Sequence, residues 1–134
     1  MFEAQTEWIA PDNFPNLSGY KFISIDLETR DPDLKSKGSG SVIGNGEIIG
    51  VAVAVDGWCK YYPFGHEGGG NLDKKRILSW LTDVCATDST KIFHNAMYDV
   101  CWLRSYGIKV NGHIMDTMVM ASLVDENRMR YTLN

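Results

Sequence analysis

The sequence predicts an α/β protein in which helices flank a mixed β-sheet, and three features of the chain indicate this fold class. Two runs rich in β-branched and aromatic residues, 47–55 and 58–63, surround an Asp-Gly pair, which is typical of a β-hairpin. Apolar residues at three- and four-residue spacing after Asp73 predict an amphipathic helix. The short strand expected next, Lys91–Phe93, adds a crossover connection to the antiparallel pair.

The region before the hairpin contains an irregular lead-in, a strand and a loop. Residues 1–19 are interrupted by proline and glycine and form the lead-in, so we place the domain at residues 20–134. Residues 20–27 carry apolar side chains on both faces, as expected of a central strand covered on both sides. Residues 30–46 are rich in Gly, Ser, Asp and Lys, which predicts a mobile loop.

Two more helices are expected in the last third of the sequence. Residues 96–106 form the first, and Gly107 ends it in left-handed geometry. The second covers residues 117–124, with Asp116 as its N-cap. The predicted order is therefore strand, two hairpin strands, helix, strand, helix and helix.

The composition is that of one globular domain. The chain has 134 residues, of which 44% are hydrophobic and 22% charged. No apolar run approaches the ~18 residues that a membrane-spanning helix needs, and the first residues lack the pattern of a signal peptide. A net charge of −4 argues against a module that simply coats DNA. It leaves open an enzyme whose carboxylates recruit metal ions.

The three cysteines, Cys59, Cys85 and Cys101, form neither a disulfide framework nor a zinc pattern, because they are widely spaced and odd in number. We interpret all three as small buried hydrophobic residues. Their use favours a reducing, cytoplasmic compartment.

Two carboxylates, Asp26 and Glu28, lie at the predicted end of the first strand. Residues two apart on an extended chain point the same way, so both side chains reach one spot. Ligands often bind at the ends of strands in open α/β sheets. A solvated turn is the alternative, and the Asp-X-Glu triplet alone would favour it. A carboxylate that follows a buried strand, however, needs a cation or hydrogen-bond donors.

A second polar cluster is predicted on one face of the helix at 96–106, where Asn95, Tyr98, Asp99 and Trp102 share that face by their spacing. The alternative is that Asn95 caps the helix and Asp99 stabilises its positive first turn. Both interpretations are compatible, but capping does not explain the mixture of polar and aromatic side chains.

These two motifs resemble the first two motifs of DEDD-type 3′–5′ exonuclease domains, as attached to family A DNA polymerases. Asp26-Leu27-Glu28-Thr29 resembles the first, and the Asn-X-X-X-Asp pattern from Asn95 to Asp99 resembles the second. Residues 104–108 and 115–118 are similar to segments that follow in the family, and residues 30–46 and 62–70 look closest to phage versions. The resemblance covers roughly residues 18–134.

The resemblance implies a ribonuclease H-like fold and removal of nucleotides from the 3′ end of single-stranded DNA with two Mg²⁺ or Mn²⁺ ions. Asp26 would bridge both ions, Glu28 would bind the ion on the nucleophile side, and Asp99 would support the other. Hard cations prefer such oxygen ligands, and two of them about 3.5–4 Å apart stabilise both the attacking and the leaving oxygen.

The resemblance also implies substrate contacts by Asn95, Tyr98 and Thr29. A stacked base contributes about 1–3 kcal/mol on an aromatic ring regardless of sequence, although an ordinary core position for Tyr98 has equal weight. Phe64 and His66 lie in a glycine-rich loop that would border the site, and we favour a surface turn for them. His94 and His113 have no second histidine at metal-ligand spacing.

The family's third motif, Tyr-X-X-X-Asp, is not found in the 134 residues, so the resemblance predicts a C-terminally incomplete domain with impaired activity. A polymerase domain or a second chain would complete the fold. Apolar surface left uncovered would favour a homo-oligomer. The alternatives are a catalytically silent domain that binds metal or a partner chain, and an exoribonuclease.

Overall fold

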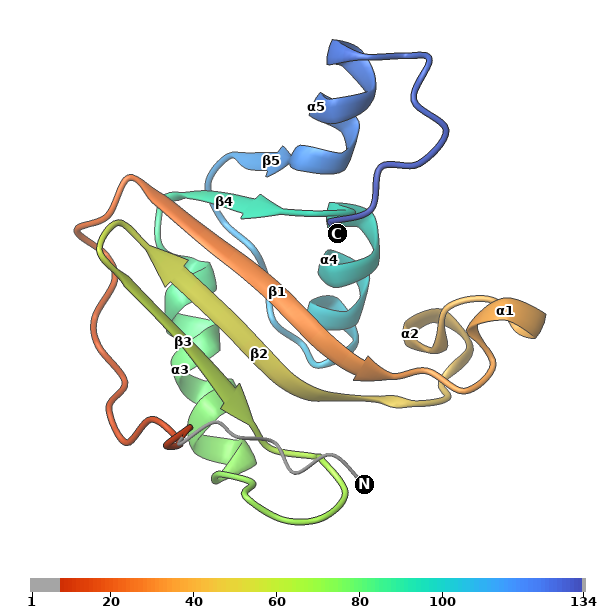
Figure 1. The fold of residues 1–134 in the computed structure, drawn as a ribbon. Coiled ribbons are helices and arrows are strands. Elements are labelled where there is room, and N and C mark those ends of the chain that lie inside the picture. Colours follow the sequence, from red (N-terminus) through yellow and green to blue (C-terminus); the bar gives the residue numbers. More distant parts are fainter. Residues whose placement is uncertain (1–7, 134) are drawn as a thin grey trace.

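A single mixed sheet of five strands organises the molecule (Figure 1). The computed structural model describes residues 8–133. The strand order is β3-β2-β1-β4-β5, in which β1 pairs antiparallel with β2 and parallel with β4. This arrangement confirms the predicted mixed α/β sheet. The strands are β1 (Phe22–Arg30), β2 (Glu47–Val55), β3 (Trp58–Pro63), β4 (Thr90–Phe93) and β5 (Ile114–Asp116).

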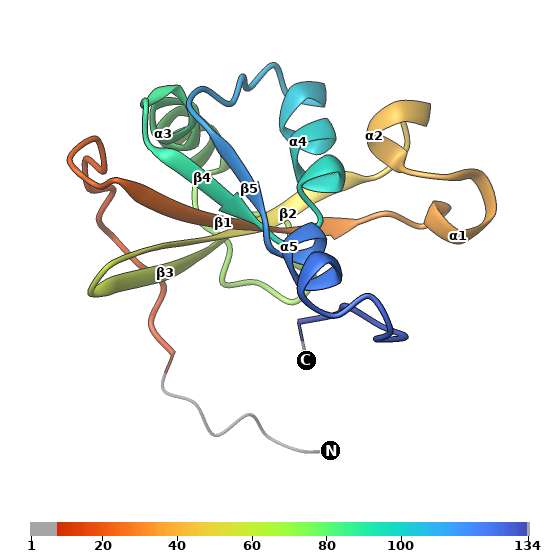
Figure 2. The same ribbon diagram turned by 90° about the horizontal axis from the view of Figure 1, so that it is seen from above.

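Helices lie unequally on the two faces of the sheet. The helices are α1 (Leu34–Lys37), α2 (Gly40–Ile43), α3 (Lys74–Ala86), α4 (Ala96–Ser105) and α5 (Thr117–Val124). Seen from above, α3 and α4 cover one face, and α5 lies on the opposite side near β5 (Figure 2). We call the side covered by α3 and α4 the packed face and the other side the open face.

The packed face carries the core because β1 alternates its side chains with a period of two. Ile23, Ile25 and Leu27 point into the core and are at most 7% exposed. The predicted apolar stripe of α3 meets them, with Ile77 and Leu81 fully buried. The central position predicted for this strand is confirmed, but the prediction that both of its faces are covered is wrong, since Asp26 and Glu28 on the open face are exposed.

The hairpin forms with the predicted bounds. Its turn contains Gly57, whose φ of 75° lies in the left-handed region that glycine adopts without strain. The helix predicted at Asp73 begins one residue later, because Asp73 is the N-cap and its carboxylate accepts a hydrogen bond from the Arg76 amide at 3.1 Å. Gly107, at φ 76°, follows the end of α4 as expected.

The described part of the lead-in, residues 8–19, is irregular, as predicted, and yet it is anchored to the sheet and to α3. Leu17 is only 3% exposed. The Trp80 indole donates to the Pro15 carbonyl at 2.8 Å, and the Tyr62 hydroxyl donates to the Asn13 carbonyl at the same distance. The segment forms no strand, and these two side chains supply hydrogen-bond donors for its backbone carbonyl groups.

Four predictions for individual segments are wrong. The first strand continues to Arg30, and residues 30–46 are not a loop throughout, because they contain α1 and α2. The carboxylate of Asp31 accepts two hydrogen bonds from the Gly40 amide, at 3.1 and 3.0 Å, which ties this segment together. Phe64 is a core residue, 7% exposed, rather than part of a surface turn. Cys59 is exposed, whereas Cys85 is buried.

Two elements near the end of the described residues, β5 and α5, also differ in part from what the sequence predicts. β5 was not expected, because a strand of three residues shows no periodicity and forms only by pairing with β4. α5 has the predicted bounds but no buried residue, and Leu123 and Val124 are 81% and 89% exposed. Self-association through such apolar surface stays a prediction. No helix within residues 8–133 is long and apolar enough to cross a membrane.

Candidate active site

The two carboxylates of the first motif lie side by side on the open face of the central strand. Asp26 and Glu28 alternate with the buried Ile25 and Leu27, so they are within β1 rather than at its end. Opposite them on β2 lie two small residues, Ala52 facing Asp26 and Gly50 facing Glu28. The small side chain of Ala52 leaves room above the sheet for a ligand, whereas the Tyr61 ring lies over Gly50.

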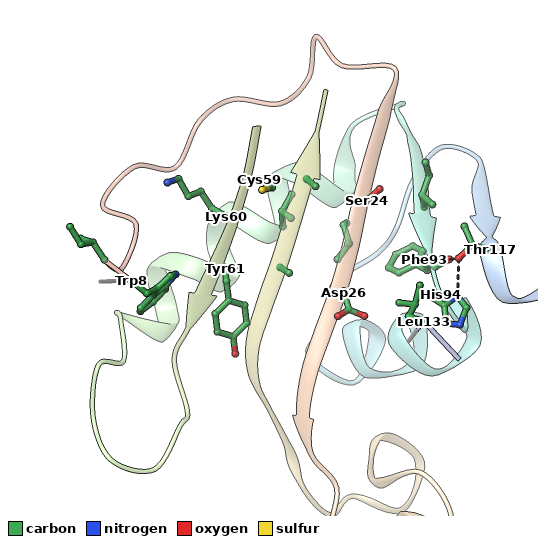
Figure 3. A pocket seen from close by; sticks show the side chains of 16 residues that line it. Trp8, Ser24, Asp26, Cys59, Lys60, Tyr61, Phe93, His94, Thr117 and Leu133 are labelled. Atoms are coloured by element: carbon green, nitrogen blue, oxygen red, sulfur yellow. Dashed lines mark hydrogen bonds between the residues drawn. The ribbon is translucent and has the colours of Figure 1, made fainter. Parts of the chain in front are cut away.

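A hollow of about 860 Å³ occupies this part of the open face. Its lining comes from four strands and includes Asp26, Ala52, Tyr61 and His94 (Figure 3). The lining is largely apolar, so a charged group such as Asp26 is only partly hydrated there. Burial raises the pKa of Asp26, and the positive potential of His94 opposes that rise.

Asp99 reaches the same region from the packed side, on the first turn of α4. Its side chain is 3% exposed, and its Oδ2 atom is buried without a hydrogen-bond partner among residues 8–133. Burial, followed by repulsion from Asp26, raises the pKa of Asp99 to about 7. Backbone hydrogen bonding at Leu27 opposes the rise, and Asp116 and Glu28 add to it. A buried carboxylate oxygen without a donor is costly unless it is protonated or binds a cation.

Asp116 organises the start of two helices. Its carboxylate accepts hydrogen bonds from the backbone amides of Asn95 (3.0 Å), Ala96 (2.8 Å) and Met118 (3.0 Å). Partial burial favours the neutral acid, but these bonds outweigh it and lower the pKa of Asp116. The predicted cap of α5 is therefore confirmed, and the same side chain also caps α4.

Asn95 is consequently not the side-chain cap that the sequence suggested. It precedes α4 with a φ of 70°, a left-handed conformation that Asn tolerates better than most residues. Its side chain is exposed and makes no capping hydrogen bond. Because Asp116 caps the helix, the side-chain amide of Asn95 is not needed as a cap and is available to a ligand.

Thr29 and Tyr98 meet at the far end of β1. The Tyr98 hydroxyl lies 2.9 Å from the Thr29 hydroxyl and donates to Asp31 Oδ2 at 2.9 Å. The ring of Tyr98 packs edge-on against Trp102, with centroids 6.4 Å apart. The structure thus brings the first and second motifs together through a direct side-chain contact.

A divalent cation fits the chemistry of these side chains, although they do not form a closed ligand shell. Among residues 8–133, no three His, Cys, Asp or Glu side chains are gathered closely enough to hold a metal ion. The unpaired Asp99 Oδ2 and the mutual repulsion of Asp99, Asp26 and Glu28 nevertheless match the need of a hard cation for anionic oxygen ligands. His113 is not part of this region, and His94 bonds instead to Thr117, at 2.9 Å from Nδ1 to Oγ1.

Sequence comparison relates the chain to DNA polymerases. It is 33% identical over 135 residues to a DNA-directed DNA polymerase of Pseudomonas phage M6, covering 96% of this chain and 20% of that protein. It is 32% identical over 81 residues to DNA polymerase I of Chloroflexus aurantiacus, covering 60% of this chain and 8% of that protein. The chain thus spans about a fifth or less of these curated relatives. No family model matches.

Solved structures share the fold. Brucella melitensis NrnC with bound Mg²⁺ superposes with a TM-score of 0.60 at 17% identity, over 92% of this chain and 54% of that one. Pol1 from M. smegmatis, in complex with DNA primer-template and dNTP, gives 0.59 at 17% identity, over 87% of this chain and 18% of that one. The chain is therefore related to the DNA polymerases that it matches in sequence, and its fold is that of nuclease domains. Its sheet has the ribonuclease H-like nuclease fold that the sequence predicted.

Two residues near the candidate site were missed at the sequence level. Asp31 accepts a hydrogen bond from Tyr98, and Tyr61, on β3, lies within the negative potential of Asp26 and Glu28 and is hydrogen-bonded to His66. The alternation of residues 58–63, combined with the hairpin register, was a signal for Tyr61. Nothing local distinguished Asp31 from the other polar residues around it.

Proposed function

We propose that this domain is a metal-dependent 3′–5′ exonuclease that hydrolyses single-stranded DNA in the manner of a proofreading domain. The relationship to DNA polymerases supports a nuclease of this type. The observation that carries the proposal is Asp99, a buried carboxylate with an unpaired oxygen, next to the exposed pair Asp26 and Glu28. Burying a carboxylate that is repelled by its neighbours and lacks a hydrogen-bond partner lowers the free energy of unfolding. A bound cation would offset that cost, so the arrangement favours a cation-binding site.

Asp26, Glu28 and Asp99 would hold the cations, each in the role that the family resemblance implies. When bound, such ions activate water and stabilise charge on the attacking and leaving oxygens. The chain itself positions these ligands. The sheet holds Asp26 and Glu28 on one strand, and α4 holds Asp99 close to that strand. Because ionised Asp99 is the ligating form, binding is favoured above its pKa of about 7.

Asn95, Thr29 and Tyr98 would contact the DNA strand at the margins of this site. Asn95 offers an exposed side-chain amide that makes no capping hydrogen bond within residues 8–133, at the start of α4. Tyr98 already commits its hydroxyl to Thr29 and Asp31, so its ring is the part free for a base or sugar. Stacking of that kind is independent of sequence, as removal of any mismatched nucleotide requires.

RNA is the second candidate substrate. The Brucella NrnC structure bound to pGG has the same fold, and so does the Aedes aegypti Nibbler EXO domain, with a TM-score of 0.56 at 13% identity. Neither likeness distinguishes the sugar that this domain accepts.

The test is release of nucleotides from single-stranded DNA and RNA of one sequence, labelled at either end, with Mn²⁺. We expect mononucleotides from the 3′ end of DNA, and no release by Asp26→Asn. Asp56→Asn, in the exposed hairpin turn, is the matched control and should act like the unaltered chain. Faster release from RNA would support the exoribonuclease. Mn²⁺ binding without any release would identify a catalytically silent domain.

A further inference from the structure

The open face has a second polar element, on the side of the hollow opposite the carboxylates. Asp26, Ala52 and Tyr61 lie in one row across β1, β2 and β3, because Asp26 pairs with Ala52 and Ala52 with Tyr61. Figure 3 shows Tyr61 on β3 and Asp26 on β1, with β2 between them. The part of the hollow along this row is a groove. It has the Tyr61 phenol on one side, the Asp26 carboxylate on the other and Ala52 as its floor.

Gly50 makes this position of Tyr61 possible. A Cβ atom at Gly50 would lie 2.0 Å from the Tyr61 hydroxyl, so the ring leans across the place where any other residue would have a side chain. Gly50 is also the β2 partner of Glu28. The hydroxyl therefore lies over the residue of β2 that pairs with Glu28.

His66 and Asn71 hold the hydroxyl in place. The Tyr61 hydroxyl is hydrogen-bonded to His66 Nε2, and the two rings are edge to face with centroids 5.8 Å apart. The Asn71 side chain binds both backbone polar groups of His66, accepting from its amide at 2.8 Å and donating to its carbonyl at 2.7 Å. This fixes one residue of an otherwise exposed, glycine-rich loop.

The surroundings of Tyr61 favour the neutral form of its phenol. Burial, then the negative potentials of Glu28 and Asp26, raise the pKa of Tyr61. A neutral phenol keeps its proton and is a hydrogen-bond donor. When His66 Nε2 carries a proton and donates it to the Tyr61 oxygen, the phenol proton can be donated to a substrate oxygen, and the groove then has acceptors on one side and a donor on the other.

We propose that Tyr61, held by His66, contacts the sugar–phosphate of the 3′-terminal nucleotide and positions it between the two sides of the groove. This inference rests on the proposed exonuclease function and adds a positioning residue to it. A sugar–phosphate needs both a donor for its oxygens and cation-binding carboxylates nearby, which is the pairing that the groove supplies. Ala52, the small residue between the two sides, leaves space for the sugar.

The experiment is a double-mutant cycle on the whole chain with Tyr61→Phe, His66→Ala and the double variant. The readouts are kcat and KM for 3′-labelled single-stranded DNA in Mn²⁺, together with thermal stability. Each single variant should lose about tenfold in kcat/KM, the size expected for one lost hydrogen bond to a charged group. The double variant should lose no more than either single one, because the two side chains act as a unit. Tyr20→Phe, an exposed tyrosine away from the groove, is the matched control.

Gly50→Ala provides a second variant, because it displaces the Tyr61 hydroxyl without removing it and should reproduce the loss of Tyr61→Phe. Full activity of Tyr61→Phe in a chain that cleaves DNA would overturn this inference and leave the proposed function intact. So would additive losses that follow thermal stability, since they would indicate a structural role. A chain with no Mn²⁺-dependent release at all would overturn both.

Discussion

The two faces of the sheet are built from the same strands but serve different ends. On β1, Ile25 and Leu27 are buried against α3 and α4, whereas Asp26 and Glu28, one position away in each case, face the open side. The packed face is apolar and closely filled. The open face brings like charges together and leaves a hollow of about 860 Å³. The packed face therefore provides the folding stability that allows like charges to lie close together on the open face.

The largest effect should come from the open face and appear only in activity. Glu28→Gln removes one charge and keeps the shape of an exposed side chain. We expect a loss of roughly 1000-fold in the rate of nucleotide release, equivalent to about 4 kcal/mol, with thermal stability unchanged. Glu126→Gln, also exposed, is the control. Equal rates for both variants would remove Glu28 from the site.

The next effect should come from the packed face and appear in stability. Leu81 is fully buried in α3, and Leu81→Ala removes packing and leaves a cavity. The expected loss in the free energy of unfolding is about 2–5 kcal/mol, measured by urea denaturation. Ser24→Ala, on the open face of β1, should change it by less than about 0.5 kcal/mol. Similar losses in the two variants would mean that the open face is also part of the core.

A smaller effect, and a pH-dependent one, should come from Asp99, which connects the faces. Its pKa rises from 3.8 to about 7 on folding, so the folded state holds a proton that the unfolded state has lost. Stability should therefore fall as the pH rises from about 4 to 7 and level off above that, by roughly 2–4 kcal/mol in total. Asp99→Asn should flatten this dependence, as followed by urea denaturation across pH. The same slope in the variant would assign it to another group.

Much of this architecture was predictable because it depends on local signals. The hairpin strands and α5 follow from an Asp-Gly turn and a cap at Asp116, both encoded within a few residues. The α1–α2 segment depends on the bond between Asp31 and Gly40, nine residues apart. β5 exists only through its pairing with β4, more than twenty residues earlier. Non-local contacts of this kind leave no periodic pattern.

The candidate site likewise contains some residues that the sequence could place and others that it could not. Spacing predicted that Asp26 and Glu28 point to one spot, although at the end of the strand rather than within it. It also placed Tyr98 with Asp99 on the helix, and resemblance suggested their chemistry. The role of Asp116 in capping α4, and the approach of Tyr61 to the carboxylates, depend on register across neighbouring strands. A one-residue change in that register would turn Tyr61 to the packed face, so the row it forms with Asp26 became visible only in the structure.

The most direct test of the central claim, that Asp26, Glu28 and Asp99 hold divalent cations, is Mn²⁺ binding to the whole chain by calorimetry at pH 7. We expect binding accompanied by proton release, because Asp99 is partly protonated near its pKa of about 7 and must ionise to become a ligand. Asp26→Asn should abolish binding, and Asp56→Asn should preserve it. Undiminished binding by Asp26→Asn, or no binding by the unaltered chain, would contradict the account.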